Sequence, residues 1–107
     1  MNTYHSKEQI LNYLKSIKGE LEGDGITTLG LFGSYARDEA DMASDIDIVI
    51  CTSKDFVDRH SGFGGVIYLD ELRQKLAKNF KTQVDICDIA SMSQERQSVL
   101  LQGVIYV

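Results

Sequence analysis

The hydrophobic positions of this chain follow two patterns, one typical of helices and the other of strands. Two segments repeat an apolar residue every three or four positions, which predicts amphipathic helices over residues 6–23 and 69–80. A last helix is expected over residues 93–102, where Gly103 would stop it. The first helix has the clearest start, because Ser6 and Gln9 have the spacing of a capping box. The helical spacing indicates that each segment buries one face against the rest of the protein.

Short runs rich in apolar and β-branched residues lie between these segments and predict four strands. The strands are expected over residues 26–32, 45–51, 83–88 and 104–107. Because helices and strands alternate, the predicted fold class is α/β, a small mixed β-sheet with helices packed against it. The segment from Thr52 to Gly65 has no clear period and contains three glycines, so we expect a loop, or a short helix with a loop.

The overall composition narrows the range of functions. With 107 residues, the chain is expected to form a single domain over residues 1–107. Its net charge of −5 argues against direct binding to nucleic acid. No apolar run approaches the roughly 18 residues of a membrane span. Cys51 and Cys87 lack metal-ligand spacing and are expected as reduced thiols in a cytoplasmic protein, while His5 and His60 are expected at the surface.

Two aspartates, Asp45 and Asp47, open the second predicted strand. They project from the same face, because side chains alternate along a strand, and Ile46 between them faces the expected core. Two carboxylates this close repel each other, and a hard divalent cation removes the repulsion. The spacing therefore indicates a metal site, and a pair of cations suits displacement at phosphorus.

A Gly-Ser pair precedes these aspartates, where the first predicted strand passes into a short helix. Ten residues separate Ser34 from Asp45. Free backbone N–H groups at a helix start, together with the Ser34 hydroxyl, can hold a phosphate. Gly33 has no side chain and lets the phosphate approach the backbone closely. The two motifs together indicate a site for a phosphate-containing ligand and its metal ions.

The combination of Gly-Ser, ten residues and Asp-x-Asp resembles the signature of the DNA-polymerase-β-like nucleotidyltransferase superfamily. The longer string GSYARDEADMASDIDIVI is similar to its small stand-alone branch, the minimal nucleotidyltransferase (MNT) domains. Many of those are antitoxins encoded beside HEPN-domain toxins. The resemblance implies transfer of AMP from Mg-ATP to a hydroxyl, with release of pyrophosphate. It further implies that the acceptor is a tyrosine of the HEPN-type ribonuclease toxin.

The same resemblance implies roles for individual residues. Asp45 and Asp47 would bind two Mg²⁺ ions, and Gly33 and Ser34 would hold the β- and γ-phosphates. A third carboxylate is expected from a neighbouring strand, and Asp85 fits because its two apolar neighbours take the opposite face. It would ligate a metal ion and accept the proton of the attacking hydroxyl.

Asp88 is the alternative third acid. It shares strand parity with Val84 and Ile86, so it would point towards the core unless the strand has already ended. Strand parity therefore favours Asp85 as the third carboxylate, and Asp88 is expected to contribute less to catalysis.

Arg37 lies one helical turn after Gly33, and its planar guanidinium suits phosphate oxygens or a nucleobase. A surface ion pair with Asp41, four residues further on, is an open alternative. The next two residues, Asp38 and Glu39, depart from the family pattern, in which glycine commonly follows this arginine. Unless these acids face solvent, we expect their charge to weaken the binding of a triphosphate.

Two other functions stay open from the sequence. The chain could be a non-catalytic antitoxin that neutralises its partner by steric binding, although the intact acidic motif argues against this. It could instead transfer a nucleotide to a small molecule, but enzymes of that kind usually carry an additional helical domain for the acceptor. The chain is too short for such a domain, so a partner is expected to supply the acceptor, and the resemblance implies that this partner is of HEPN type.

Overall fold

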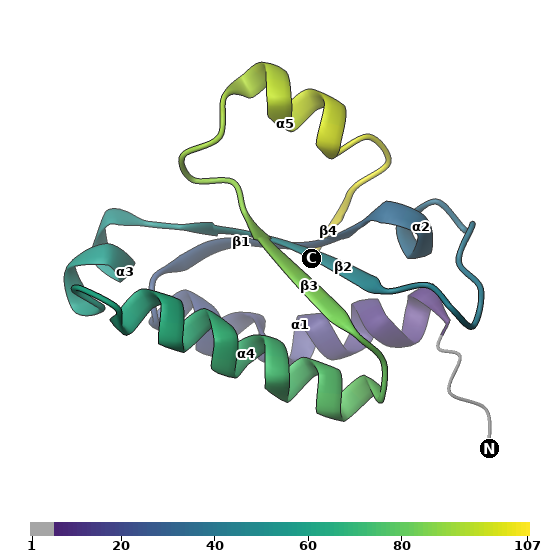
Figure 1. Cartoon of the computed structure of the whole chain (residues 1–107), viewed down its shortest axis with the longest axis horizontal. Helices are drawn as coiled ribbons and strands as arrows, with labels where there is room; N and C mark the ends of the chain where they lie inside the picture. The colour runs from purple at the N-terminus through teal and green to yellow at the C-terminus, as the bar shows by residue number, and fades with distance from the viewer. Residues whose placement is uncertain (1–5) are drawn as a thin grey trace.

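The computed structural model describes residues 6–107, and Figure 1 shows how its helices and strands are arranged. Helices and strands alternate along this part of the chain, except that two helices follow one another in its middle. The elements are α1 (Lys7–Gly23), β1 (Ile26–Phe32), α2 (Gly33–Ala36), β2 (Ile46–Thr52), α3 (Lys54–Arg59), α4 (Gly64–Phe80), β3 (Val84–Asp88), α5 (Gln94–Leu100) and β4 (Ile105–Tyr106).

The strands form one mixed sheet in the order β3-β2-β1-β4. β1 runs antiparallel to β2 and to β4, whereas β2 runs parallel to β3. Helices α1 and α4 pack together on one face of the sheet, and α5 stands on its other side (Figure 1). The predicted fold class, a small mixed sheet with helices packed against it, is confirmed.

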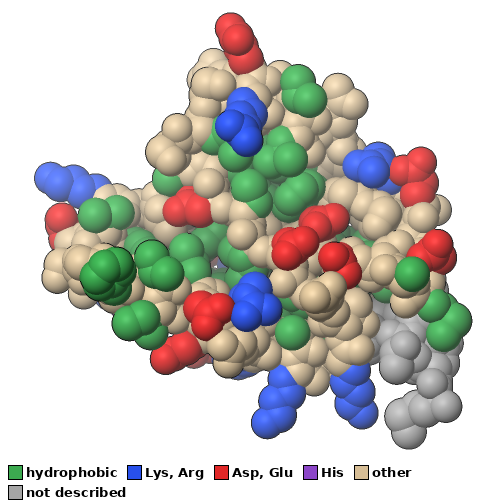
Figure 2. Space-filling model, in the orientation of Figure 1, with side chains coloured by type: hydrophobic (Ala, Val, Ile, Leu, Met, Phe, Trp, Pro, Cys, Tyr) green, Lys and Arg blue, Asp and Glu red, His purple; other side chains and the backbone are tan. Residues whose placement is uncertain are grey.

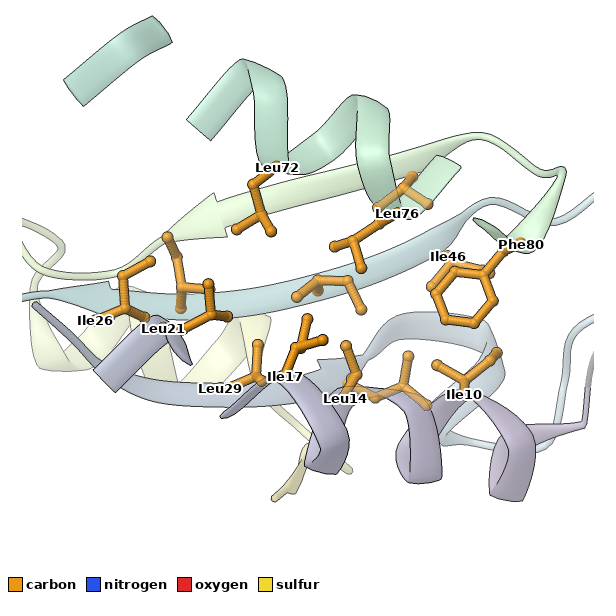
Figure 3. Packing of buried hydrophobic residues seen from close by; sticks show 14 of the residues in the cluster. Ile10, Leu14, Ile17, Leu21, Ile26, Leu29, Ile46, Leu72, Leu76 and Phe80 are labelled. Carbon is orange, nitrogen blue, oxygen red and sulfur yellow. The ribbon is translucent and has the colours of Figure 1, made fainter. Parts of the chain in front are cut away.

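The main hydrophobic core lies between the sheet and the two long helices (Figure 3). From β2, the residues Ile46, Ile48 and Ile50 are completely buried in it. Burying each such side chain stabilises the fold by about 1.5–3 kcal/mol. The helices contribute the residues predicted from their spacing, namely Ile10, Leu14, Ile17 and Leu21 from α1, and Leu72, Leu76 and Phe80 from α4. This burial orients β2 and sends its odd-numbered side chains to the opposite face.

A smaller apolar cluster occupies part of that opposite face, beneath α5. Its buried members are Phe32, Val49 and Ile89. Cys51 and Cys87 pack against it and are free thiols, as predicted. The cluster covers Val49 but not Asp47, which lies two residues earlier on the same strand and is half-buried. This face of the sheet therefore stays open at the amino ends of β2 and β3.

The observed element bounds differ from the predicted ones in a few places. The capping box at Ser6 is confirmed, since its hydroxyl accepts from the Gln9 N–H at 3.1 Å and the Gln9 side chain accepts from the Ser6 N–H at 3.0 Å. Helix α4 begins earlier than its apolar spacing predicts. Its first turns expose Val66 and Ile67, with 67% and 55% of their surface accessible, so no buried face marks them in the sequence.

The segment from Thr52 to Gly65 contains a short helix and a loop, which was one of the two predicted alternatives. Ser53 caps α3, because its hydroxyl accepts from the Phe56 N–H at 3.2 Å. The same hydroxyl donates to the Gly25 carbonyl at 2.7 Å and so ties α3 to the turn that precedes β1.

His60 is only partly exposed. Its ring lies 4.5 Å from the ring of Phe56 and 5.0 Å from that of Tyr68. His5 lies outside the described residues. No helix within residues 6–107 is both long and apolar enough to cross a membrane.

Candidate active site

The register of the sheet brings the predicted site residues together. Asp47 pairs with Asp85 across the parallel β2–β3 ladder, so their backbones lie side by side. On its other side Asp47 pairs with Phe32, the last residue of β1. Gly33, the first residue of α2, follows Phe32 directly, so the start of α2 lies beside Asp47, which in turn lies beside Asp85. Asp45 precedes β2 by one residue and is half-buried.

Two features of position 33, its backbone conformation and the closeness of Asp47, require a glycine there. Its φ of +77° lies in the left-handed region, which side chains disfavour. A Cβ atom added there would lie 3.0 Å from Cγ of Asp47 and would collide with Oδ2 of the same carboxylate. The sequence indicated a glycine for the approach of a phosphate. The structure adds that this glycine makes room for a carboxylate of the site.

The electrostatics of the site centre on Asp47. Burial raises the pKa of this carboxyl, and the negative charges of Asp85 and Asp45 raise it further, whereas the positive charge of Arg37 lowers it. The charges of Asp85 and Asp45 therefore oppose the ionisation of Asp47. In Figure 2, acidic side chains gather near the middle of the visible face, over the region where β2 and β3 run in Figure 1.

The chemistry of these side chains fits a divalent cation. Carboxylate oxygens are the ligands that Mg²⁺ prefers, and a cation would relieve the repulsion at Asp47. Within residues 6–107, however, no three acidic, histidine or cysteine side chains are grouped closely enough to hold a metal ion as they stand. Since the ladder already sets Asp47 beside Asp85, side-chain rotation is the movement needed to bring the oxygens together.

The start of α2 presents polar groups beside these acids. Helix α2 follows Phe32 directly and has no side-chain cap. Among the described residues, no group forms a hydrogen bond with the hydroxyl of Ser34, which is half-buried. The start of α2 therefore leaves this hydroxyl available to a ligand, and the predicted binding of a phosphate here stays a prediction.

Asp85 is exposed, whereas Asp45 and Asp47 are half-buried. A hollow of about 290 Å³ lies elsewhere, at the far end of β1, and is lined by Thr27, Thr28, Leu29, Ile89, Tyr106 and Val107. It contains none of the predicted site residues. An acceptor can reach Asp85 from solvent because this side chain is exposed.

Comparison with known proteins identifies the family. The model of the nucleotidyltransferase domain matches residues 7–107, which include all the residues named above. The chain belongs to this family.

Individual relatives agree with this assignment. The chain is 33% identical over 101 residues to the protein adenylyltransferase MntA of Thermococcus cleftensis, covering 94% of each protein. A solved structure described as a minimal nucleotidyltransferase superposes with a TM-score of 0.73 at 18% identity, covering 97% of this chain and 98% of the other. The enzyme class and the MNT branch predicted from the sequence are thus confirmed.

Two further solved structures share the fold. One is a toxin–antitoxin complex with AMP-PNP, with a TM-score of 0.63 at 23% identity over 95% of this chain and 72% of the other. The second is a mutant of the toxin–antitoxin pair MntA–HpeT, with a TM-score of 0.60 at 22% identity over 95% of this chain and 71% of the other.

Asp88, the alternative third acid of this nucleotidyltransferase, lies away from the site. It ends β3 and pairs with Ile50 near the opposite end of the ladder. One carboxylate oxygen accepts from the N–H groups of Thr52 and Ala90 at 3.2 and 3.0 Å. The other accepts from the Thr52 hydroxyl at 2.7 Å. These bonds give Asp88 a structural role in holding the end of β2 to β3.

Arg37 forms an ion pair, but not with the predicted residue. Its Nε lies 2.6 Å from Oε1 of Glu39, whereas Asp41 instead accepts hydrogen bonds from the Ala43 N–H and the Ser44 hydroxyl. The predicted pairing with Asp41 is therefore wrong. The guanidinium still acts on the site, because its charge lowers the pKa of Asp47.

The two acids that depart from the family pattern both face solvent. The side chain of Asp38 is 72% exposed and pairs with Lys7 at 2.9 Å, and that of Glu39 is 62% exposed. Because Asp38 and Glu39 face solvent, their charges are not expected to weaken the binding of a triphosphate.

Nothing in the sequence indicated that the turn at Gly103 lies near Arg37, because a glycine after a helix indicates only where that helix ends.

Proposed function

We propose that this nucleotidyltransferase transfers AMP from Mg-ATP to a hydroxyl of a partner toxin, and so acts as its antitoxin. The observation that carries the proposal is that the start of α2 at Gly33 lies beside Asp47 of β2, which pairs with Asp85 of β3. The relative named protein adenylyltransferase MntA supports the reaction, and the toxin–antitoxin structures of the same fold support the partner. Reduced Cys51 and Cys87 are consistent with a cytoplasmic protein.

The proposed roles follow the order of groups across the sheet. Gly33 and Ser34 hold the β- and γ-phosphates at the start of α2, with Arg37 nearby. Asp45, Asp47 and Asp85 would together hold two Mg²⁺ ions, which supply positive charge to the reacting phosphate when bound. The MntA–HpeT mutant carries two aspartate-to-glutamate substitutions two residues apart, the same spacing as Asp45 and Asp47.

The reaction is a displacement at the α-phosphorus. The acceptor oxygen forms a bond to phosphorus while the bond to the bridging oxygen of pyrophosphate breaks. Pyrophosphate leaves on the side of α2, so the acceptor hydroxyl approaches from the opposite side, over β3. Asp85 is exposed on that side and accepts the hydroxyl proton.

The partner is proposed to be a HEPN-type ribonuclease toxin and the acceptor one of its tyrosines. The exposure of Asp85 suits a side chain delivered by another protein, and the net charge of −5 disfavours direct binding to nucleic acid. One observation favours a second candidate, a non-catalytic antitoxin that binds sterically. Within residues 6–107, the carboxylates do not converge on a metal-binding point as they stand.

Intact-mass measurement tests the proposal after co-expression with the protein of the neighbouring reading frame, which is expected to be of HEPN type. The partner is expected to gain the mass of one or more AMP units, and peptide mapping should locate them on tyrosine. Asp47→Asn should abolish the gain while the two proteins still associate. A partner that is neutralised without any change in mass would establish the steric alternative. An adduct on a small molecule or a transfer RNA would refute the assigned partner but not the enzyme class.

A further inference from the structure

We propose that Glu39 and the turn at Gly103 together position Arg37, so that its terminal nitrogens face the phosphates of the nucleotide. This inference rests on the proposed function, because it concerns the same nucleotide. It assigns a positioning role to two residues outside the Gly-Ser and Asp-x-Asp motifs. Three sets of contacts support it.

The first contact fixes one edge of the guanidinium. Nε of Arg37 donates to Oε1 of Glu39 at 2.6 Å. Among the described residues, no acceptor engages the two Nη atoms, so they remain available to a bidentate acceptor such as a phosphate.

The second set of contacts fixes Glu39 itself. Its backbone N–H donates to the carbonyl of Ser34 at 2.8 Å, while Asp38 adopts the left-handed conformation with φ 59°. This is the pattern of a helix closed by a left-handed residue, a position where glycine is usual and aspartate is tolerated. Glu39 is therefore attached to the same turn that presents the Ser34 hydroxyl, and Arg37 is held in register with that turn.

The third contact supports the stem of the arginine. Gly103 has a φ of +77°, and a Cβ atom added there would lie 3.2 Å from Cγ and 3.7 Å from Cδ of Arg37. The turn between α5 and β4 thus lies directly against the aliphatic part of this side chain. Arg37 is held from both ends, which reduces the conformational freedom that it would lose on binding a nucleotide.

An exposed ion pair alone contributes little to stability. We therefore expect Glu39 to act by orienting the guanidinium of Arg37. The opposite possibility is that Glu39 competes with phosphate for Arg37. The two possibilities predict opposite changes in nucleotide affinity when the side chain is removed. Glutamine distinguishes them further, because it keeps an oxygen that can accept from Nε but has no charge.

The test is the KM for ATP and the kcat of adenylylation, measured with the partner toxin present. Glu39→Ala is expected to raise KM by about three- to tenfold, the range associated with ordering one long side chain, with little change in kcat. Glu39→Gln should restore a KM close to that of the unmodified protein. Asp38→Asn removes the same charge one residue away and tolerates the left-handed backbone, so it is the matched control and should leave KM unchanged.

A second pair of variants tests the turn. Gly103→Ala should raise KM because its methyl group meets Arg37, whereas Gly62→Ala should not, since its φ is also positive at +63° but the space around it is open. A lower KM in Glu39→Ala would overturn the proposal in favour of competition. Equal effects of Glu39→Ala and Asp38→Asn would overturn it in favour of net charge. Calorimetric titration of the same variants with Mg-ATP needs no acceptor, so it tests the positioning even if no partner is modified.

Discussion

The two ends of the β2–β3 ladder place aspartates in different surroundings, against another carboxylate at one end and among hydrogen-bond donors at the other. At the amino end, Asp47 and Asp85 lie side by side, and no hydrogen-bond donor within residues 6–107 engages either carboxylate. At the other end, Asp88 accepts three hydrogen bonds from Thr52 and Ala90. Asp85 and Asp88 are thus the same residue type, three positions apart on β3. Asp85 lies against another carboxylate, whereas Asp88 is held by hydrogen bonds within the fold.

This difference separates a site from a structural contact. A fold optimised for stability alone would not place two carboxylates against each other, because like charges repel. Such arrangements are concentrated at functional sites, where a ligand supplies the missing charge. The hydrogen-bonded Asp88 needs no ligand, so its removal should disturb the fold more than the chemistry.

The largest expected effect is on catalysis. Asp85→Asn should reduce the rate of AMP transfer by about 10²–10⁴-fold, the contribution of a positioned base. Asp88→Asn changes the same charge three residues away and should retain most of the activity. The measurement is the initial rate of adenylylation with the partner toxin at saturating ATP. If Asp88→Asn were the inactive variant, the assignment of Asp85 to catalysis and of Asp88 to the fold would be wrong.

The next largest effect is on stability, where removing Asp88 should cost more than removing Asp85. Asp88→Ala leaves the half-buried N–H and hydroxyl of Thr52 without their acceptor and should lower the free energy of unfolding by about 1–3 kcal/mol. Asp85→Ala removes an exposed side chain next to Asp47 and should change it by much less. Urea denaturation of both variants, monitored by circular dichroism, gives the two values. Equal losses would show that Asp88 is not a structural contact.

The smallest effect concerns pH in the metal-free protein. Folding raises the pKa of Asp47 above its ordinary value of 3.8, so the folded state holds this proton more tightly than the unfolded chain. The associated stability is present below that ordinary value and is lost as pH rises through the raised pKa. In chelator, Asp47→Asn should therefore reduce the decline in unfolding free energy between acidic and neutral pH. An identical pH profile in the variant and the unmodified protein would show that the repulsion is relieved in some other way.

Much of the fold could be predicted because its signals are local. The capping box at Ser6, the apolar faces of α1 and α4, and the alternation along β2 all depend on residues within a few positions of each other. The same locality allowed Asp45 and Asp47 to be assigned to the face opposite Ile46. Where the local signal was weak, as at the exposed start of α4, the predicted bounds were wrong.

By itself, the sequence determined the buried faces of α1 and α4, the strand bounds to within one residue, the Gly-Ser turn and the paired aspartates, because backbone periodicity and side-chain alternation act over short distances. Only the tertiary structure decided that Asp85 lies beside Asp47, that Thr52 donates to Asp88, and that Gly103 lies near Arg37. These contacts join segments far apart in the chain. Strand order and register depend on how the whole hydrophobic surface is buried, and no short stretch of residues contains that information.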